Sequence, residues 1–171
     1  MLSILNVDKR PLWLILFISA LFLEGAALYF QYVLGYEPCV KCIYTRVAVF
    51  GFILAGLIGL IAPNKLLVRL LAYGIFVLSL ISAFIIAFEH IEVQRNTLSI
   101  FAICEAIPNF PEWFQIHIWF PDLFEVRGSC GDVNWEMFSL SMPEWMVVIY
   151  SMYTLSFLIV IINRLYQFRT L

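Results

Sequence analysis

The sequence predicts an all-α membrane protein, a bundle of four transmembrane helices with a short interfacial helix in the second outer loop. Of its 171 residues, 63% are hydrophobic and only 13% are charged, whereas about 25% are charged in an average soluble domain. Ten Lys and Arg residues against twelve Asp and Glu residues leave no basic surface. Composition therefore excludes a soluble enzyme, a disordered chain and a nucleic-acid-binding protein.

Four apolar runs are each long enough to cross a bilayer, which takes about 20 helical residues. The first run follows Lys9 and Arg10 and is uncharged apart from Glu24. It is too long for the hydrophobic region of a signal peptide and no small-residue cleavage site closes it, so we expect an uncleaved helix. No alternating pattern suggests a β-barrel. The expected spans, within one domain over residues 1–171, are 11–33, 44–62, 69–88 and 145–163.

The distribution of basic residues predicts the orientation of the bundle. With four spans both termini lie on one side, and most of the ten basic residues lie there too. The loops on the other side cover about residues 34–43 and 89–144, and the longer one is rich in Asp and Glu. The positive-inside rule therefore puts the termini in the cytoplasm and both loops outside. The basic residues on the cytoplasmic side are Lys9, Arg10, Lys65, Arg69, Arg164 and Arg169.

One segment of the long loop has the pattern of a surface helix. Residues 110–121 are bracketed by prolines, and Trp113, Ile116 and Phe120 recur at helical spacing. Tryptophan suits the headgroup region of a bilayer, so we expect a short helix lying on the membrane surface. A loop packed against the ends of the transmembrane helices is the alternative.

All four cysteines fall in the two outer loops: Cys39, Cys42, Cys104 and Cys130. An even number of cysteines on the oxidising side of a membrane implies disulfides, with three possible connectivities. A purely structural disulfide would suit Cys104 and Cys130, where closing the loop contributes about 3 kcal/mol on the chain-entropy model.

The Cys39-Val-Lys-Cys42 pair is not expected to be a structural disulfide, because a disulfide across two residues closes almost no loop and stabilises the fold little. Such pairs are typical of exchangeable dithiols in which one thiolate is stabilised. Cys42 lies near the start of the second helix, where the helix dipole favours a thiolate, and Arg46 lies one turn deeper on the same face. No metal is expected: an all-cysteine zinc site usually takes two close pairs, and haem attachment needs His where Ile43 stands.

Several segments together resemble the DsbB family, bacterial inner-membrane proteins that reoxidise the periplasmic thiol oxidant DsbA by passing electrons to quinone. The resemblance covers the whole chain, including the number of spans and the lengths of the loops. The segments are Glu37-Pro-Cys-Val-Lys-Cys-Ile-Tyr-Thr-Arg46 and its continuation to Gly51, Phe88-Glu-His90, Cys104, Phe110-Pro-Glu-Trp113, Gly128-Ser-Cys130 and Met142-Pro-Glu-Trp145.

The resemblance implies a role for each of the four cysteines as catalytic residues. Cys104 should be attacked by the reduced partner, a periplasmic DsbA-like thiol oxidase. Cys130 should then attack Cys39, which releases Cys42 as a thiolate facing a membrane quinone. The resemblance further implies that Cys42, Arg46 and His90 bind this cofactor, either ubiquinone or menaquinone, in the bacterial inner membrane.

Other polar and aromatic residues give weaker signals. Glu24 is a functional candidate because an intramembrane carboxyl is costly, although a protonated or hydrogen-bonded structural role is the favoured interpretation. His117 is expected to be interfacial, and Trp145 and Tyr150 are packing residues that could also border the quinone site.

Two alternative functions stay open at this point. One is a four-helix scaffold or transporter subunit whose disulfides are only structural; the other is a paralogue that serves a different dithiol partner. Quinone reduction by a reduced thioredoxin-like protein would exclude the scaffold.

Overall fold

The computed structural model describes residues 9–95 and 107–168. Long helices form wherever the apolar runs occur, because a backbone in hydrocarbon must satisfy its hydrogen bonds internally. The four long helices are α1 (Arg10–Tyr32), α2 (Val40–Ile61), α3 (Leu66–Arg95) and α6 (Met142–Phe168). All four are long and apolar enough to cross a membrane, which confirms the predicted fold class. The short elements are α4 (Ile116–Trp119), α5 (Pro121–Phe124), β1 (Glu136–Met137) and β2 (Leu140–Ser141).

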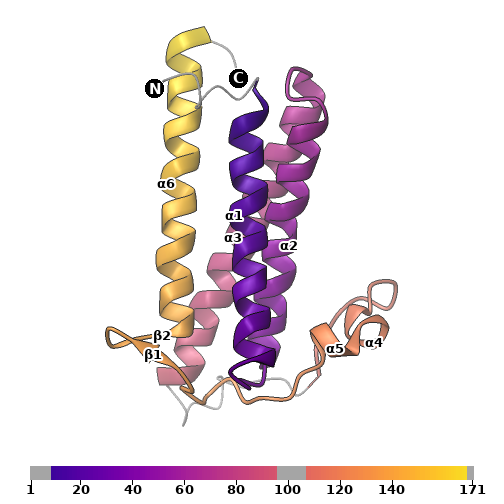
Figure 1. The fold of residues 1–171 in the computed structure, drawn as a ribbon, viewed down its shortest axis with the longest axis vertical. Helices are drawn as coiled ribbons and strands as arrows, with labels where there is room; N and C mark the ends of the chain where they lie inside the picture. Colours follow the sequence, from indigo (N-terminus) through magenta and orange to yellow (C-terminus); the bar gives the residue numbers. More distant parts are fainter. Residues whose placement is uncertain (1–8, 96–106, 169–171) are drawn as a thin grey trace.

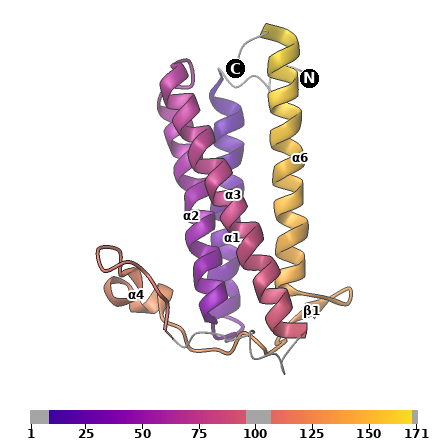
Figure 2. The same ribbon diagram turned by 180° about the vertical axis from the view of Figure 1, so that it is seen from behind.

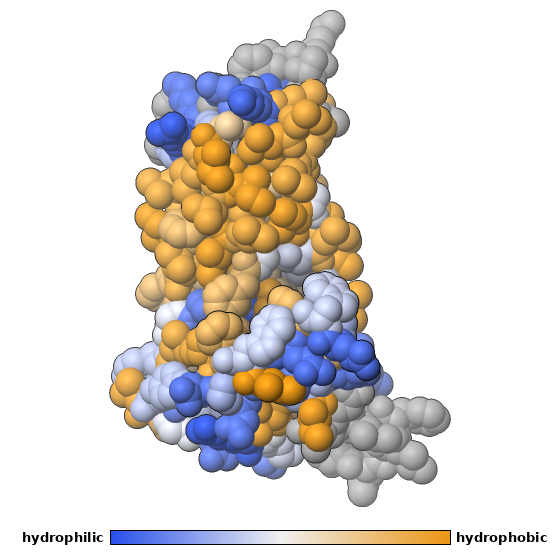
Figure 3. Space-filling model, turned by 90° about the vertical axis from the view of Figure 1, so that its right-hand side faces the viewer, coloured by the Kyte–Doolittle hydropathy of each residue, from blue (hydrophilic) through white to orange (hydrophobic). Residues whose placement is uncertain are grey.

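The long helices stand side by side and alternate in direction, so α1 begins and α6 ends at the same end of the bundle (Figures 1 and 2). At the opposite end lie the start of α2, the end of α3 and all the short elements. Figure 3 shows a broad apolar belt between two polar ends, the surface expected of a protein embedded in lipid.

Helix α2 is the centre of the bundle, packing against both α1 and α3, while α6 packs against α3. Close approach is possible because α2 presents glycine at the contact: a Cβ on Gly56 would lie 2.9 Å from the backbone nitrogen of Phe17. The core between the helices is aromatic, and Phe52 and Tyr150 are fully buried within it.

The helices extend beyond the predicted spans, most of all α3. This helix continues to Arg95, whose guanidinium contacts the carboxylate of Glu144 at 2.6 Å. His90 therefore lies within α3 rather than at its end. Glu144 also accepts hydrogen bonds from the backbone and hydroxyl of Ser141, an arrangement typical of a helix N-terminus. Polar contacts thus hold the ends of α3 and α6 together outside the apolar belt.

The predicted surface helix is shorter than its pattern indicated. Only Ile116–Trp119 and Pro121–Phe124 are helical, each for four residues. Pro111 and Pro121 explain this, because proline cannot donate a helical hydrogen bond and restricts the residue before it. Trp113 is 77% exposed, whereas Ile116 and Phe124 pack onto Ile43 of α2. The segment is therefore anchored to the bundle and also presents aromatic side chains outward.

Candidate functional site

The dithiol pair lies where the first outer loop enters α2. Cys39 is the N-cap of α2, and its Sγ accepts a hydrogen bond from the backbone nitrogen of Cys42 at 3.4 Å. The two Sγ atoms are 3.0 Å apart and both thiols are free. The hydrogen bond with Cys42, together with burial, raises the pKa of the Cys39 thiol well above its usual range. Cys42 is therefore the sulfur better placed to carry the negative charge.

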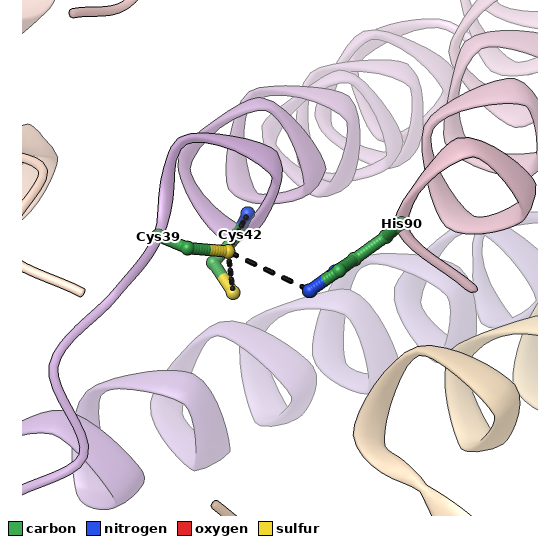
Figure 4. A group of neighbouring side chains, drawn as sticks. All are labelled: Cys39, Cys42 and His90. Atoms are coloured by element: carbon green, nitrogen blue, oxygen red, sulfur yellow. Dashed lines mark hydrogen bonds between the residues drawn. The ribbon is translucent and has the colours of Figure 1, made fainter. Parts of the chain in front are cut away.

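His90 reaches the same pair from α3 (Figure 4). Its Nε2 atom lies 3.7 Å from Sγ of Cys39, and its ring is also hydrogen-bonded to the backbone of Cys130. The side chain is buried, with 7% exposed. The sequence placed His90 at the level of Cys42, but the sulfur it contacts is that of Cys39.

These three side chains also form a set of possible metal ligands. The two Sγ atoms and a ring nitrogen of His90 all lie within 4.8 Å of one another. A closed structural zinc site needs four ligands, and Cys130, the other described cysteine, is disulfide-bonded and offers no thiolate. The short distance between the sulfurs is the more informative feature, because it places them in position to form a disulfide.

The segment that carries Cys130 is docked on the loop that carries Cys39. The backbone nitrogens of Arg127 and Gly128 both donate to the carbonyl of Pro38, at 3.0 and 3.1 Å. Gly128 is required there, since a Cβ would collide with the carbonyl oxygen of Glu37. Cys130 is fully buried and packs in one cluster with Cys39. The fourth predicted cysteine, Cys104, lies outside the described residues.

Arg46 is buried one turn below Cys42, with 5% exposed. Its guanidinium donates to the carbonyl of Leu123 at 2.7 Å and to the carbonyl of Ala27 at 3.2 Å. Its charge also interacts with Cys42 and with Glu24. A cation inside the apolar belt is thus held in place by backbone from both α1 and the second loop.

A cavity of about 470 Å³ opens beside these residues, between α1, α2, α3 and α6. Its walls are mostly apolar and include Phe22, Phe30 and Trp145. Polar side chains converge in it as well, and they include Glu24, Gln31, Glu37, Cys42, Thr45, Arg46 and His90. A mainly apolar cavity with a few convergent polar groups is the usual form of a site for a small organic molecule.

A smaller cavity of about 60 Å³ lies on the outer side of the pair, and both cysteines and His90 line it. Cys42 borders both cavities, whereas Cys39 borders only the outer one. The two sulfurs therefore face different surroundings, Cys39 toward the loops and Cys42 also toward the membrane.

Glu24 gave a weaker signal in the sequence, which favoured a structural role, and its role stays a prediction. The structure has its side chain 7% exposed and lining the large cavity. Within the part of the chain that the structure describes, its carboxyl group has no hydrogen bond or ion pair, although Arg46 acts on it electrostatically. The signal available in the sequence was a carboxyl inside a span, which is a functional candidate by default. Trp145 lines the cavity as predicted, whereas Tyr150 is packed in the core.

Four apolar helices with a free dithiol at one end, beside a third cysteine that is disulfide-bonded, define a membrane disulfide oxidoreductase. The family model described as "Disulfide bond formation protein DsbB" matches residues 9–160. The chain therefore belongs to the DsbB family, as its motifs predicted, and this membership favours disulfide exchange over a scaffold with purely structural disulfides.

Individual relatives are similar in sequence to nearly the whole chain, and each of the three described here carries the name "Disulfide bond formation protein B". The protein from Pseudoalteromonas atlantica is 40% identical, with 92% of each chain covered. The protein from Haemophilus influenzae strain 86-028NP is 41% identical, covering 95% of this chain and 91% of its own. That from Shewanella denitrificans is 45% identical, covering 90% of this chain and 87% of its own.

Proposed function

We propose that this protein reoxidises a periplasmic DsbA-like dithiol protein by disulfide exchange and passes the electrons to a membrane quinone. The observation that carries the proposal is the position of Cys42, which borders both the outer cavity and the apolar cavity inside the bundle. One sulfur can thus take part in exchange with the loop cysteines and face a lipid-soluble acceptor.

The residues around the large cavity fit a quinone. Apolar and aromatic walls suit the ring, the buried guanidinium of Arg46 offers a hydrogen bond to a carbonyl oxygen, and the His90 side chain borders the same cavity. When bound, a quinone accepts two electrons and two protons. Ubiquinone and menaquinone both present two carbonyls to the same polar groups, so the site suits either.

The chain's own groups then have separate tasks. Arg46 favours the thiolate of Cys42, because an opposite charge at close range stabilises the ionised form. The carboxyl group of Glu24, which faces the same cavity, holds a proton and delivers it from its oxygen atom. His90 keeps Cys39 oriented through the contact with its Sγ atom.

The proposed relay moves two electrons through the four cysteines, and each step breaks one disulfide as it forms another. A thiolate of the partner attacks Cys104, which breaks a Cys104–Cys130 disulfide and frees the Cys130 thiolate. Cys130 attacks Cys39 and breaks its bond to Cys42, so that Cys42 leaves as a thiolate. The packing of Cys130 against Cys39 supports this step, since exchange needs the attacking and attacked sulfurs in contact.

The second half of the relay restores the loop disulfide. The partner's other thiolate attacks the partner's sulfur in the mixed disulfide. The partner then leaves with its own disulfide formed, and Cys104 is released as a thiolate. Cys104 then attacks Cys130 and releases Cys39. Two electrons now reside in the reduced Cys39 and Cys42 pair, which becomes a disulfide again when the quinone is reduced. A free dithiol beside a disulfide-bonded Cys130 corresponds to the state before this last step.

We also propose the bacterial inner membrane as the location, with the termini in the cytoplasm and the cysteine loops in the periplasm. Lys9, Arg10, Lys65 and Arg69 cluster at the expected cytoplasmic end, which supports this orientation. In intact spheroplasts treated with reductant, a membrane-impermeant maleimide should label the cysteines. Labelling only after the membrane is broken would reverse the orientation.

The function is tested by mixing the purified protein with a reduced thioredoxin-like dithiol protein and ubiquinone, and by following quinone absorbance. Turnover is expected for the wild type, whereas Cys42→Ser should allow exchange with the dithiol protein but no quinone reduction. A wild type that exchanges disulfides and never reduces either ubiquinone or menaquinone would contradict the proposal.

A further inference from the structure

The free dithiol pair and His90 bring three metal-binding atoms together at the outer end of the bundle. The Sγ atoms of Cys39 and Cys42 are 3.0 Å apart, and Nε2 of His90 is 3.7 Å from Sγ of Cys39. All three atoms lie within 4.8 Å of one another. Figure 4 shows the imidazole ring reaching the two sulfurs from the neighbouring helix. The spacing of the cysteines did not indicate this set, because His90 belongs to α3.

These distances are close to those between the ligands of a tetrahedral zinc ion. With bonds of about 2.3 Å to sulfur and about 2.0 Å to nitrogen, a sulfur and a nitrogen ligand lie about 3.6 Å apart and two sulfur ligands about 3.8 Å apart. The separation of Cys39 and His90 already agrees with the first value. The two sulfurs would have to separate by roughly 0.8 Å. A small rotation of the Cys42 side chain, which is only partly buried, is enough.

The surroundings of the three atoms suit a bound cation. The ring of His90 is hydrogen-bonded to the backbone of Cys130, and histidines that bind metals usually make such a bond through the other ring nitrogen. Sγ of Cys39 accepts a hydrogen bond from the backbone nitrogen of Cys42, which an anionic sulfur ligand can keep. Two thiolates cancel the charge of a divalent cation, so the buried complex is neutral and avoids the cost of an unpaired charge.

The outer cavity gives a cation access to the pair. It measures about 60 Å³ and is lined by all three donor residues, so it has room for an ion with a water ligand. Glu37 and Asp132 line the same cavity and are exposed, and their carboxylates attract a cation toward it. The ammonium group of Lys41 is paired with Glu89, which weakens its repulsion of a cation.

We propose that the reduced pair of Cys39 and Cys42 binds a zinc ion together with His90, and that water or a loop carboxylate takes the fourth position. Two cysteines, one histidine and an exchangeable ligand form a donor set that zinc uses in proteins. Binding releases the two thiol protons to solvent and transfers no electrons. A disulfide offers no thiolate, so the site exists only while the pair is reduced. Bound zinc holds the protein in that state, and this consequence alone rests on the proposed function.

Zinc titration of the full-length protein tests the inference. Cys104→Ser combined with Cys130→Ser leaves Cys39 and Cys42 as the two remaining thiols. After reduction with a phosphine, this double variant should bind one zinc ion per chain, measured by competition with a zinc-binding dye. Reoxidation of the pair to the disulfide should abolish binding. Zinc binding that persists after reoxidation would overturn the inference.

A matched pair of histidine variants in the same background measures the third ligand. His90→Gln should weaken zinc binding by at least ~10-fold, since losing even an outer-shell partner of a metal ligand has that effect. His117→Gln, in the second loop, should leave the affinity unchanged. X-ray absorption at the zinc edge gives an independent measurement without a histidine substitution. It should show two sulfur ligands at about 2.3 Å and at least one nitrogen ligand at about 2.0 Å.

Equal affinity in His90→Gln, or a zinc environment without a histidine nitrogen, would overturn the inference. In the wild type, zinc added to the reduced protein before the quinone should slow quinone reduction, and a chelator should restore the rate. A protein that binds zinc through these three side chains, but never reduces a quinone when free of metal, would support this inference and contradict the proposed function.

Discussion

Arg46 of α2 donates a hydrogen bond of 2.7 Å to the backbone carbonyl of Leu123. A buried cation inside the membrane is thereby connected directly to the second loop, the loop that also carries Cys130. The same guanidinium lines the large cavity beside Cys42. Arg46 therefore contacts both the second loop and the cavity proposed for the quinone.

Replacing Arg46 with Met should separate the two half-reactions. The substitution keeps much of the side-chain volume but removes the charge beside Cys42 and the donors in the cavity. Quinone reduction should fall by at least ~10-fold, equivalent to about 1.4 kcal/mol in the barrier. Disulfide exchange between Cys104 and the partner should continue, and both rates are measured in one preparation.

Arg69→Met is the control for the loss of a buried arginine, since Arg69 is 4% exposed and lines neither cavity. This variant should lose stability without a specific loss of quinone reduction. Unchanged quinone reduction in Arg46→Met would mean that the quinone binds elsewhere.

Removing Cys130 should trap the partner. Cys130→Ser removes the thiolate that carries the relay to Cys39, so the mixed disulfide between Cys104 and the partner should accumulate on a non-reducing gel. Cys104→Ser should abolish the adduct. If the adduct forms equally well on Cys39 when Cys104 is absent, the proposed order of transfer is wrong.

Gly128→Ala should slow the attack of Cys130 on Cys39, although the substitution changes neither cysteine. The added Cβ would collide with the carbonyl of Glu37 and push Cys130 away from Cys39, at a cost of roughly 1–3 kcal/mol for overpacking. The Cys104 adduct should therefore persist longer than in the wild type. Gly74→Ala, where a Cβ has nothing within 4 Å, should behave like the wild type.

Glu24→Gln tests the proton-carrying role of the intramembrane carboxyl. The amide keeps the shape of the side chain but cannot transfer a proton, so quinone reduction should fall by at least ~10²-fold, the lower end of the contribution of a general acid. Glu24→Asp should restore part of the rate. The exposed Glu112→Gln serves as control, and exchange with the partner should be normal in all three. Full activity in Glu24→Gln would make the carboxyl a structural group.

The sequence alone was sufficient for the number of membrane-spanning helices and for the position of the dithiol at the start of α2. Long apolar runs have only one stable backbone form in lipid. The period of 3.6 residues also put Cys42 and Arg46 on one face of the helix, because they are four residues apart. The sequence predicted one short surface helix between Pro111 and Pro121, whereas the structure has two helices of four residues, Ile116–Trp119 and Pro121–Phe124.

Only the tertiary structure decided which side chains meet around the dithiol. The contact of His90 with Cys39, the docking of Gly128 on Pro38 and the position of Glu24 in the cavity all join residues far apart in the chain. In a soluble helix a polar face and an apolar face indicate which side points inward. A membrane helix is apolar toward lipid as well as toward its neighbours, so its rotation is set by close packing, such as that of Gly56 on Phe17.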